Sequence, residues 1–254
     1  MTNLLLPHSR LLAPSPQAKG LLKLLYGNWG LQEQSGGRSD LSGFGNHLTD
    51  NNTVTGNPGP SGRLPLASQF TAATSESLSI ADNVALSTGD IDFTLCGWIY
   101  FDTTPASYFG LVTRWHGSGV NQTEYIFYKT NLNPGVFEFA VSSTGADATV
   151  VTASTFGNVT TGTWYFVVCW HDSVLNTINI QVNNGAVDSV AYALGVFDSN
   201  AVFRLGGQEL VPTNFLDGRM AGMGFWKRVL TAAERTYLYN RGQGRAFRGS
   251  QGFV

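Results

Sequence analysis

The chain has 254 residues, of which 43% are hydrophobic and only 13% are charged, about half the charged share of an ordinary soluble domain. Its formal net charge of −2 provides no basic field for nucleic acid, and no run of 18 apolar residues predicts a membrane-spanning helix. Its 30 glycines suit strands joined by tight turns. We therefore expect an all-β protein with no nucleic-acid or membrane partner.

The first 19 residues are apolar but contain three prolines and no basic leading segment, so we do not expect a signal peptide. We predict an N-terminal arm over residues 1–19, a domain over residues 20–244 and a tail over residues 245–254. The arm is expected to lie against its own domain or a neighbouring subunit. Its predicted contact residues are Leu4, Leu5, Leu6, Leu11 and Leu12. Residues 55–65 (TGNPGPSGRLP) are interpreted as a surface loop because of their glycines and prolines.

Alternating apolar residues predict strands through the middle of the chain. In residues 177–190, Ile178, Ile180 and Val182 are expected to face inward, and Asn184-Gly185 predicts a type I′ hairpin turn. Residues 123–130 and 135–143 predict a second strand pair. In residues 90–101, one face is expected to hold Ile91, Phe93, Leu95, Ile99 and Phe101, and the other Cys96, Trp98 and Tyr100. About ten to twelve strands at such spacing indicate a sandwich or a barrel.

The chain's two cysteines, Cys96 and Cys169, both lie in predicted strands. We interpret them as buried free thiols, which behave as small apolar residues. A disulfide between neighbouring strands stays open, because the sequence does not decide it.

A single helix is predicted near the end of the chain, over residues 231–241. Thr231 and Glu234 have the spacing of a capping box. Leu230, Ala233 and Tyr237 recur at helical spacing, and a glycine follows the last turn.

The order of segments from SGGRSDLSGFGNHL (residues 35–48) through DFTLCGWIYF and GTWYFVVCWHD to FLDGRMAGMGFWKRVLTAAERTYLYNRGQG (residues 215–244) resembles the laminin-G-like, concanavalin A-like domains. The resemblance covers residues 20–244. It implies a jelly-roll sandwich of two antiparallel sheets, with a short helix after the last strand covering one end of the sandwich. Aromatic positions such as Trp98 and Trp164 usually lie in the core of such domains.

Some members of that family bind calcium through an acidic residue shortly after the glycine of the last strand. Here Gly218 is followed by Arg219, so that position is not acidic. Asp40, Asp50 and Asp217 remain as candidate ligands, but calcium needs six to eight oxygens. We expect no cofactor and keep calcium as the alternative.

Catalytic patterns are not found in the sequence. Glycosidases of this fold place two carboxylates across the sugar bond, and no glutamate here is two residues from another acid. We therefore expect a protein that is not an enzyme, with a glycoside hydrolase as the remote alternative. The loop-rich segment around residues 105–125 is the candidate for binding. Trp115, His116 and Asn121 could offer a stacking surface and polar groups to a sugar, unless Trp115 fills the sandwich edge.

Two functional hypotheses follow. The first is a structural protein of a virion, most simply of a phage, as a capsid decoration or a fibre-type adhesion subunit. The fold normally works outside cells while no export signal is visible, and virion proteins are made in the host cytoplasm and released by lysis. Its partners would be other virion subunits or further copies in a homo-oligomer. The alternative is an extracellular, secreted carbohydrate-binding module that binds a cell-surface glycan. The path of residues 1–19 would separate the two.

Overall fold

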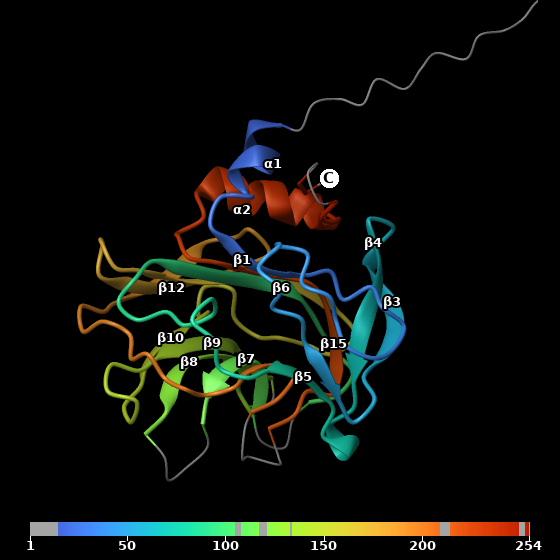
Figure 1. Cartoon of the computed structure of the whole chain (residues 1–254), viewed down its shortest axis with the longest axis horizontal. Helices are drawn as coiled ribbons and strands as arrows, with labels where there is room; N and C mark the ends of the chain where they lie inside the picture. The colour runs from blue at the N-terminus through green and yellow to red at the C-terminus, as the bar shows by residue number, and fades with distance from the viewer. Residues whose placement is uncertain are drawn as a thin grey trace, which may run out of the picture.

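The computed structural model describes residues 15–104, 108–116, 121–132, 134–208, 214–248 and 252–253. Two antiparallel sheets face each other in a jelly-roll sandwich, as expected, and two helices lie above the larger sheet (Figure 1). No helix in these ranges is long and apolar enough to cross a membrane. The five leucines predicted as arm contacts, from Leu4 to Leu12, lie outside the described residues.

The larger sheet contains eight strands among the described residues. Its order is β13 (Val187–Ala191), β12 (Thr177–Val182), β11 (Trp164–Asp172), β6 (Phe93–Phe101), β15 (Gly218–Trp226), β4 (Leu64–Phe70) and β3 (Thr55–Ser61), with β1 (Leu25–Trp29) also pairing with β15. The smaller sheet has seven strands in the described part of the chain. Its order is β10 (Thr149–Thr152), β9 (Phe137–Val141), β8 (Thr123–Lys129), β7 (Phe109–Trp115), β14 (Phe203–Leu205), β5 (Ser77–Ile80) and β2 (Thr49–Asn51).

The main core lies between the sheets and follows the alternation of the sequence. Phe93, Leu95, Ile99 and Phe101 of β6 face this core, as do Ile178, Ile180 and Val182 of β12. The smaller sheet contributes a matching row, formed by Tyr125, Phe127, Phe137, Phe139, Val141 and Val151. Aromatic rings meet across the gap, for example Phe93 and Tyr125 with ring centroids 5.3 Å apart. The predicted inward positions of these residues are confirmed, whereas Ile91, predicted on the same face, precedes β6 and lies half-buried outside this core.

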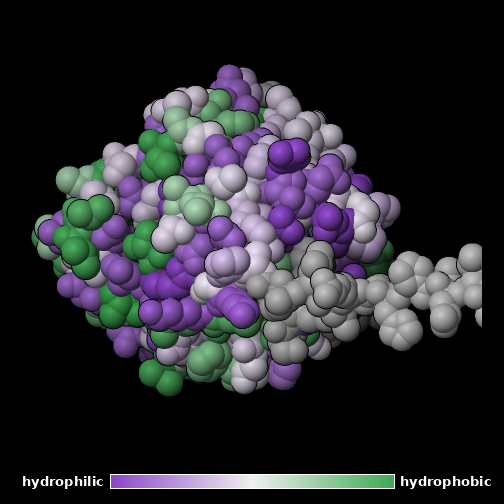
Figure 2. Space-filling view, turned by 90° about the horizontal axis from the view of Figure 1, so that it is seen from above, coloured by the Kyte–Doolittle hydropathy of each residue, from purple (hydrophilic) through white to green (hydrophobic). Residues whose placement is uncertain are grey.

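A second core covers the outer face of the larger sheet. Helix α2 (Ala232–Tyr239), Leu21 and Phe253 lie over side chains that include Trp98, Phe166 and Trp226, and helix α1 (Pro16–Gly20) lies against α2. The Tyr239 ring stacks on Trp98 at 6.0 Å, and the indole of Trp226 donates to the carbonyl of Leu21 at 2.8 Å. Seen from the helix side, hydrophilic residues dominate the middle of this surface (Figure 2). Because α2 packs on these side chains, it covers a face of the larger sheet and not the end of the sandwich that the resemblance implied.

The helix itself forms as its capping residues predict. Thr231 accepts from the backbone of Glu234 at 3.2 Å, and Glu234 accepts from the backbone of Thr231 at 2.9 Å. The chain leaves the helix at Asn240, whose φ of 48° is left-handed, and a turn of 3-10 helix η2 (Asn240–Gly242) follows. The buried stripe differs from the expected one: Glu234 and Leu238 are buried, whereas Ala233 is exposed.

Two local predictions were wrong. Residues 55–65 are not a loop: most of them form β3 and the turn into β4, and β3 tolerates Pro58 and Pro60 because it is an edge strand that needs fewer backbone donors. The hairpin turn after β12 is centred on Asn183 and Asn184, with φ of 50° and 55°, one residue earlier than predicted. A 3-10 turn, η1 (Ala72–Thr74), links β4 to β5.

The cysteines are free and buried. Cys96 belongs to the core outside the larger sheet, whereas Cys169 belongs to the core between the sheets. The two thiols therefore point to opposite faces of one sheet, which excludes the disulfide that the sequence left open.

Residues 16–20, which straddle the end of the predicted arm, form helix α1. Ser15 caps α1 by accepting from the backbone of Ala18 at 3.1 Å, and α1 lies against α2. This part of the predicted arm thus packs on its own domain, while the boundaries at residues 19 and 244 stay predictions.

Candidate functional site

The outer face of the smaller sheet carries a hollow of about 180 Å³. Its lining side chains are Tyr108, Trp115, Ile126, Tyr128, Ala140, Ala148 and Val150. We call this feature the aromatic hollow. It is smaller than the roughly 300–1,000 Å³ of sites that enclose a drug-sized ligand, so it suits one small unit of a larger molecule.

Strand register explains why the surface is hollow here. Ile126, Ala140 and Val150 are direct neighbours on β8, β9 and β10, so they form a row on the face opposite to the core. Alanine in the middle of this row leaves space that a larger side chain would fill. Trp115 stands at the end of β7, and Tyr128 stands two residues beyond Ile126 on β8. Large aromatic side chains therefore border a floor of small and aliphatic ones.

The aromatic side chains are half-buried and fixed in place. The rings of Tyr108 and Tyr128 lie 5.2 Å apart between centroids, tilted by 58°. The Tyr108 hydroxyl donates to Oε1 of buried Gln208, which also accepts from Asn214 Nδ2 at 2.9 Å. Burial raises the pKa of Tyr108, so its hydroxyl keeps its proton at neutral pH. One end of the hollow thus combines aromatic rings with ordered amide groups.

A carboxylate stands at this same end. Glu138 is the direct neighbour of Tyr128 on β9 and accepts from Thr152 Oγ1 at 2.8 Å. Burial, followed by the hydrogen bond with Glu138, raises the pKa of Tyr128 well above its usual value. Tyr128 therefore keeps its proton at neutral pH and donates to Glu138.

The wall that contains Ala148 is held by its neighbour Asp147. This carboxylate accepts from Ser142 Oγ at 2.7 Å, from Ser143 N at 2.9 Å and from Thr144 N at 2.9 Å, with further bonds from both hydroxyls at positions 143 and 144. Burial raises the pKa of Asp147, but these hydrogen bonds outweigh it and leave the pKa far below its usual range. The loop is therefore ordered by an ionised side chain.

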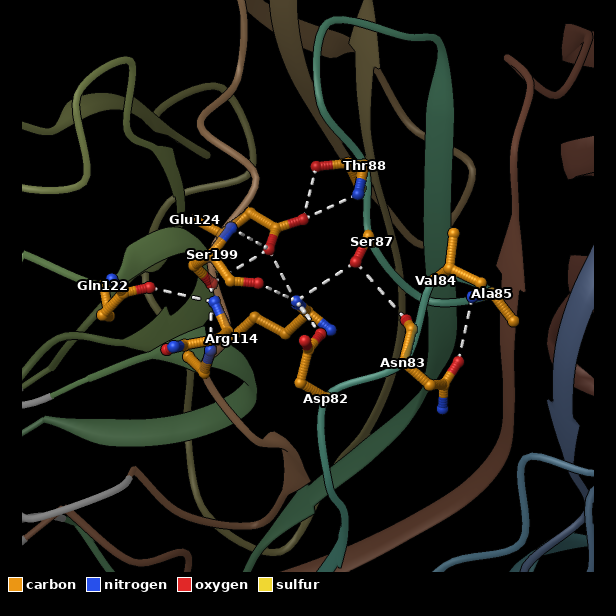
Figure 3. Close-up of polar contacts among 12 residues, drawn as sticks. Asp82, Asn83, Val84, Ala85, Ser87, Thr88, Arg114, Gln122, Glu124 and Ser199 are labelled. Carbon is orange, nitrogen blue, oxygen red and sulfur yellow. Dashed lines mark hydrogen bonds and ion pairs between the residues drawn. The ribbon is translucent and has the colours of Figure 1, made fainter.

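Beside the hollow, a buried ion pair joins three segments of the chain (Figure 3). Arg114 precedes Trp115 on β7, and its Nε donates to Glu124 Oε2 on β8 at 2.7 Å; neither side chain is exposed. Arg114 also meets Asp82 at 2.8 Å. Glu124 further accepts from the backbone and hydroxyl of both Thr88 and Ser199. This network attaches the loop around residues 82–88 to the strands that carry Trp115 and Ile126.

The predicted binding residues fall in different places. Trp115 lines the aromatic hollow. His116 and Asn121 do not line it; the Nδ1 atom of His116 is buried without a partner among the described residues, and the Asn121 carbonyl lies near Gly145. Sequence reasoning missed Tyr108 and Tyr128. The available signal was the alternation of Ile126 and Tyr128 against inward-facing Tyr125 and Phe127.

The three candidate metal ligands each have protein partners. Asp40 accepts from the backbones of Asn28, Ser42 and Asn46, Asp50 from that of Val54, and Asp217 from the Thr103 hydroxyl. Within the described ranges, no group of three or more histidine, cysteine or acidic side chains could hold a metal ion. Asp40 instead orders the loop after β1.

Comparison with known proteins places the chain in a family. The family model described as the concanavalin A-like lectin/glucanases superfamily matches residues 72–234. No curated protein sequence matches the chain. Solved structures with the same fold include the binding domain of Paraclostridial Mosquitocidal Protein 1, with a TM-score of 0.68 and 17% identity over 87% of this chain and 52% of that one. This chain thus spans about half the length of that toxin domain.

Two further structures are similar over most of this chain. Domain 4 of AbnA, an extracellular arabinanase from Geobacillus stearothermophilus solved in complex with arabinotriose, has a TM-score of 0.60 and 14% identity over 84% of this chain and 97% of that one. A structure of botulinum neurotoxin type C, whose cell entry depends on interaction with two ganglioside molecules, has a TM-score of 0.65 and 12% identity over 90% of this chain and 54% of that one. Identities this low show a common fold. The family match over residues 72–234 shows more: the chain belongs to the concanavalin A-like lectin/glucanase superfamily.

Proposed function

We propose that this protein is a non-catalytic carbohydrate-binding module that works outside the cell and holds a sugar unit in the aromatic hollow. The observation that carries the proposal is the open hollow that Tyr108, Trp115 and Tyr128 line on the outer face of the smaller sheet, which no described helix covers. This is the secreted, lectin-like alternative of the sequence analysis rather than its virion hypothesis.

The chemistry of the hollow suits a sugar. A pyranose or furanose ring has apolar C–H faces and a polar rim, so it gains from aromatic surface bordered by hydrogen-bonding groups. Here the rings of Trp115 and Tyr128 supply the surface. The Gln208 amide, the Glu138 carboxylate and the tyrosine hydroxyls supply donors and acceptors at one end. Because hydrogen bonds within the protein already orient these groups, binding costs little side-chain entropy.

The similar structures support a binding role. One is a domain of an arabinanase solved with arabinotriose, and another belongs to a toxin that interacts with gangliosides. Catalysis is not proposed: the most buried glutamate, Glu124, is engaged by Arg114 and by four donors from Thr88 and Ser199. A place in a virion and a homo-oligomer stay predictions of the sequence, since none of the similar proteins named above points to them.

The proposal is tested by glycan-array binding followed by calorimetry with the best ligand. Trp115→Ala should weaken that binding by at least about tenfold. The reason is that the contact of the sugar with the aromatic ring contributes more than about 1 kcal/mol to the binding free energy. Phe44→Ala is the matched control: Phe44 is an aromatic side chain that is 53% exposed and stacks on Tyr26, away from the hollow. No binding across plant, bacterial, algal and animal glycans, or equal binding by both variants, would refute the proposal.

A further inference from the structure

The charged groups at the aromatic hollow share one sign. Its lining includes no charged side chain among the described residues. Glu138 stands at one end, hydrogen-bonded to Tyr128 and Thr152. Asp147, next to lining residue Ala148, is held ionised by its loop. A ligand in the hollow therefore meets an apolar, aromatic lining, with the Glu138 carboxylate beside Tyr128 as the charged group next to it.

The sequence supplies almost no positive charge to this part of the molecule. Residues 64–203 contain 11 acidic residues and two basic ones, Arg114 and Lys129. Arg114 is fully buried and paired with Glu124 and Asp82. Lys129 is 1% exposed, donates to the Thr130 carbonyl and lies over a core ring. Neither cation is available to a ligand.

The segments that adjoin the hollow in sequence add no positive charge. Residues 105–107, 117–120 and 209–213 adjoin described segments at the hollow in sequence, and they contain no lysine or arginine. The nearest basic residue on the same row of the sheet is Arg204 of β14, which is the direct neighbour of Thr113. Its Nη1 donates to Ser77 Oγ at 2.7 Å, on the side of β14 that faces β5 and not the hollow.

We propose that the aromatic hollow selects uncharged sugar units and rejects acidic ones, such as sialic acid, uronic acids and sulfated sugars. This rests on the proposed carbohydrate binding. An acidic sugar normally needs an arginine or lysine to offset the loss of its hydration. Here it would lose hydration against apolar side chains and also approach the Glu138 carboxylate beside Tyr128, where like charges repel. A neutral sugar can instead donate hydrogen bonds from its hydroxyl groups to that carboxylate.

The test uses immobilised glycans in matched pairs that differ only in one charged group: a galactose-terminated chain and its sialylated form, a glucose and a glucuronic acid chain, and a sulfated and an unsulfated sugar. The wild-type protein should bind the neutral member at least about tenfold more tightly. Glu138→Gln should reduce the ratio of the affinity for the neutral glycan to the affinity for the acidic one. Lowering the salt concentration should increase this ratio in the wild type only. Glu33→Gln is the control, since Glu33 lies on a different segment beside Arg38.

The outcomes are distinguishable. Tighter binding of the acidic members by the wild type overturns this inference, while a loss of that binding in Trp115→Ala would still support the proposed function. Equal binding of both members also overturns it. If no member of any pair binds, the proposed function fails and this inference with it.

Discussion

Replacing Glu124 by glutamine should test the buried ion pair beside the hollow. The Glu124 side chain has no exposed area and accepts from Arg114 Nε at 2.7 Å, from Thr88 N and Oγ1 at 2.7 Å each, and from Ser199 Oγ at 3.0 Å. Glutamine keeps the shape, but it removes the charge and turns one acceptor into a donor that faces other donors. Breaking a buried pair by removing one partner costs about 3–5 kcal/mol, so we expect a loss of that size in unfolding free energy.

Urea unfolding followed by tryptophan fluorescence measures this loss. Asp102→Asn is the matched control, because Asp102 and Arg219 form an ion pair at 3.3 Å with side chains that are 30% and 21% exposed. Pairs of that kind contribute only about 0–1 kcal/mol. A change below about 1 kcal/mol for Glu124→Gln would refute the view that this pair anchors the loop around residues 82–88. The same variant should also weaken glycan binding, since Trp115 follows Arg114 directly.

Two further predictions concern pH and thiol chemistry. Burial raises the pKa of Glu234, but its hydrogen bonds with Arg228 and with the helix cap outweigh this effect and place the pKa below the usual 4.5. Ionised Glu234 therefore stabilises the fold above pH 4.5, and this contribution is lost as the pH falls through the folded-state pKa. The difference in unfolding free energy between wild type and Glu234→Gln should be full at neutral pH and shrink as the pH falls below 4.5. A difference that stays constant with pH would contradict this prediction. Burial raises the pKa of both cysteine thiols, so Cys96 and Cys169 should resist a thiol reagent until the protein unfolds. A reducing agent should leave the melting temperature unchanged. Labelling of either thiol in the native protein would count against the buried placement.

The sequence predicted those features that depend on local pattern. Alternation on β6 and β12 separated the two faces of each strand, because side chains alternate strictly along a strand. The capping box around Thr231 located the start of α2, since one turn of helix contains all its partners. Both predictions hold because neighbours along the chain decide them.

Features that depend on pairing between distant strands were out of reach. The aromatic hollow exists because Ala140 lies beside Ile126 and Val150, and a change of register by one residue would put different side chains in that row. The pairing of Arg114 with Glu124 and Asp82 likewise joins residues up to 32 positions apart. Residues 55–65 were misjudged for a related reason: their prolines argue against a central strand, but only the topology shows that β3 is an edge.

Among the described residues, the two sheets differ in what covers their outer faces, and this difference supports the proposed place of binding. On the larger sheet, Trp98, Phe166 and Trp226 are buried under Leu21, α2 and Phe253. On the smaller sheet, Trp115 and Tyr128 have no helix over them within the described ranges. An apolar, aromatic face left open to water does not stabilise the fold, and such patches mark interaction sites. Within the described ranges the chain covers one aromatic face with α2, Leu21 and Phe253 and leaves the other open, and we propose that this open face binds the ligand.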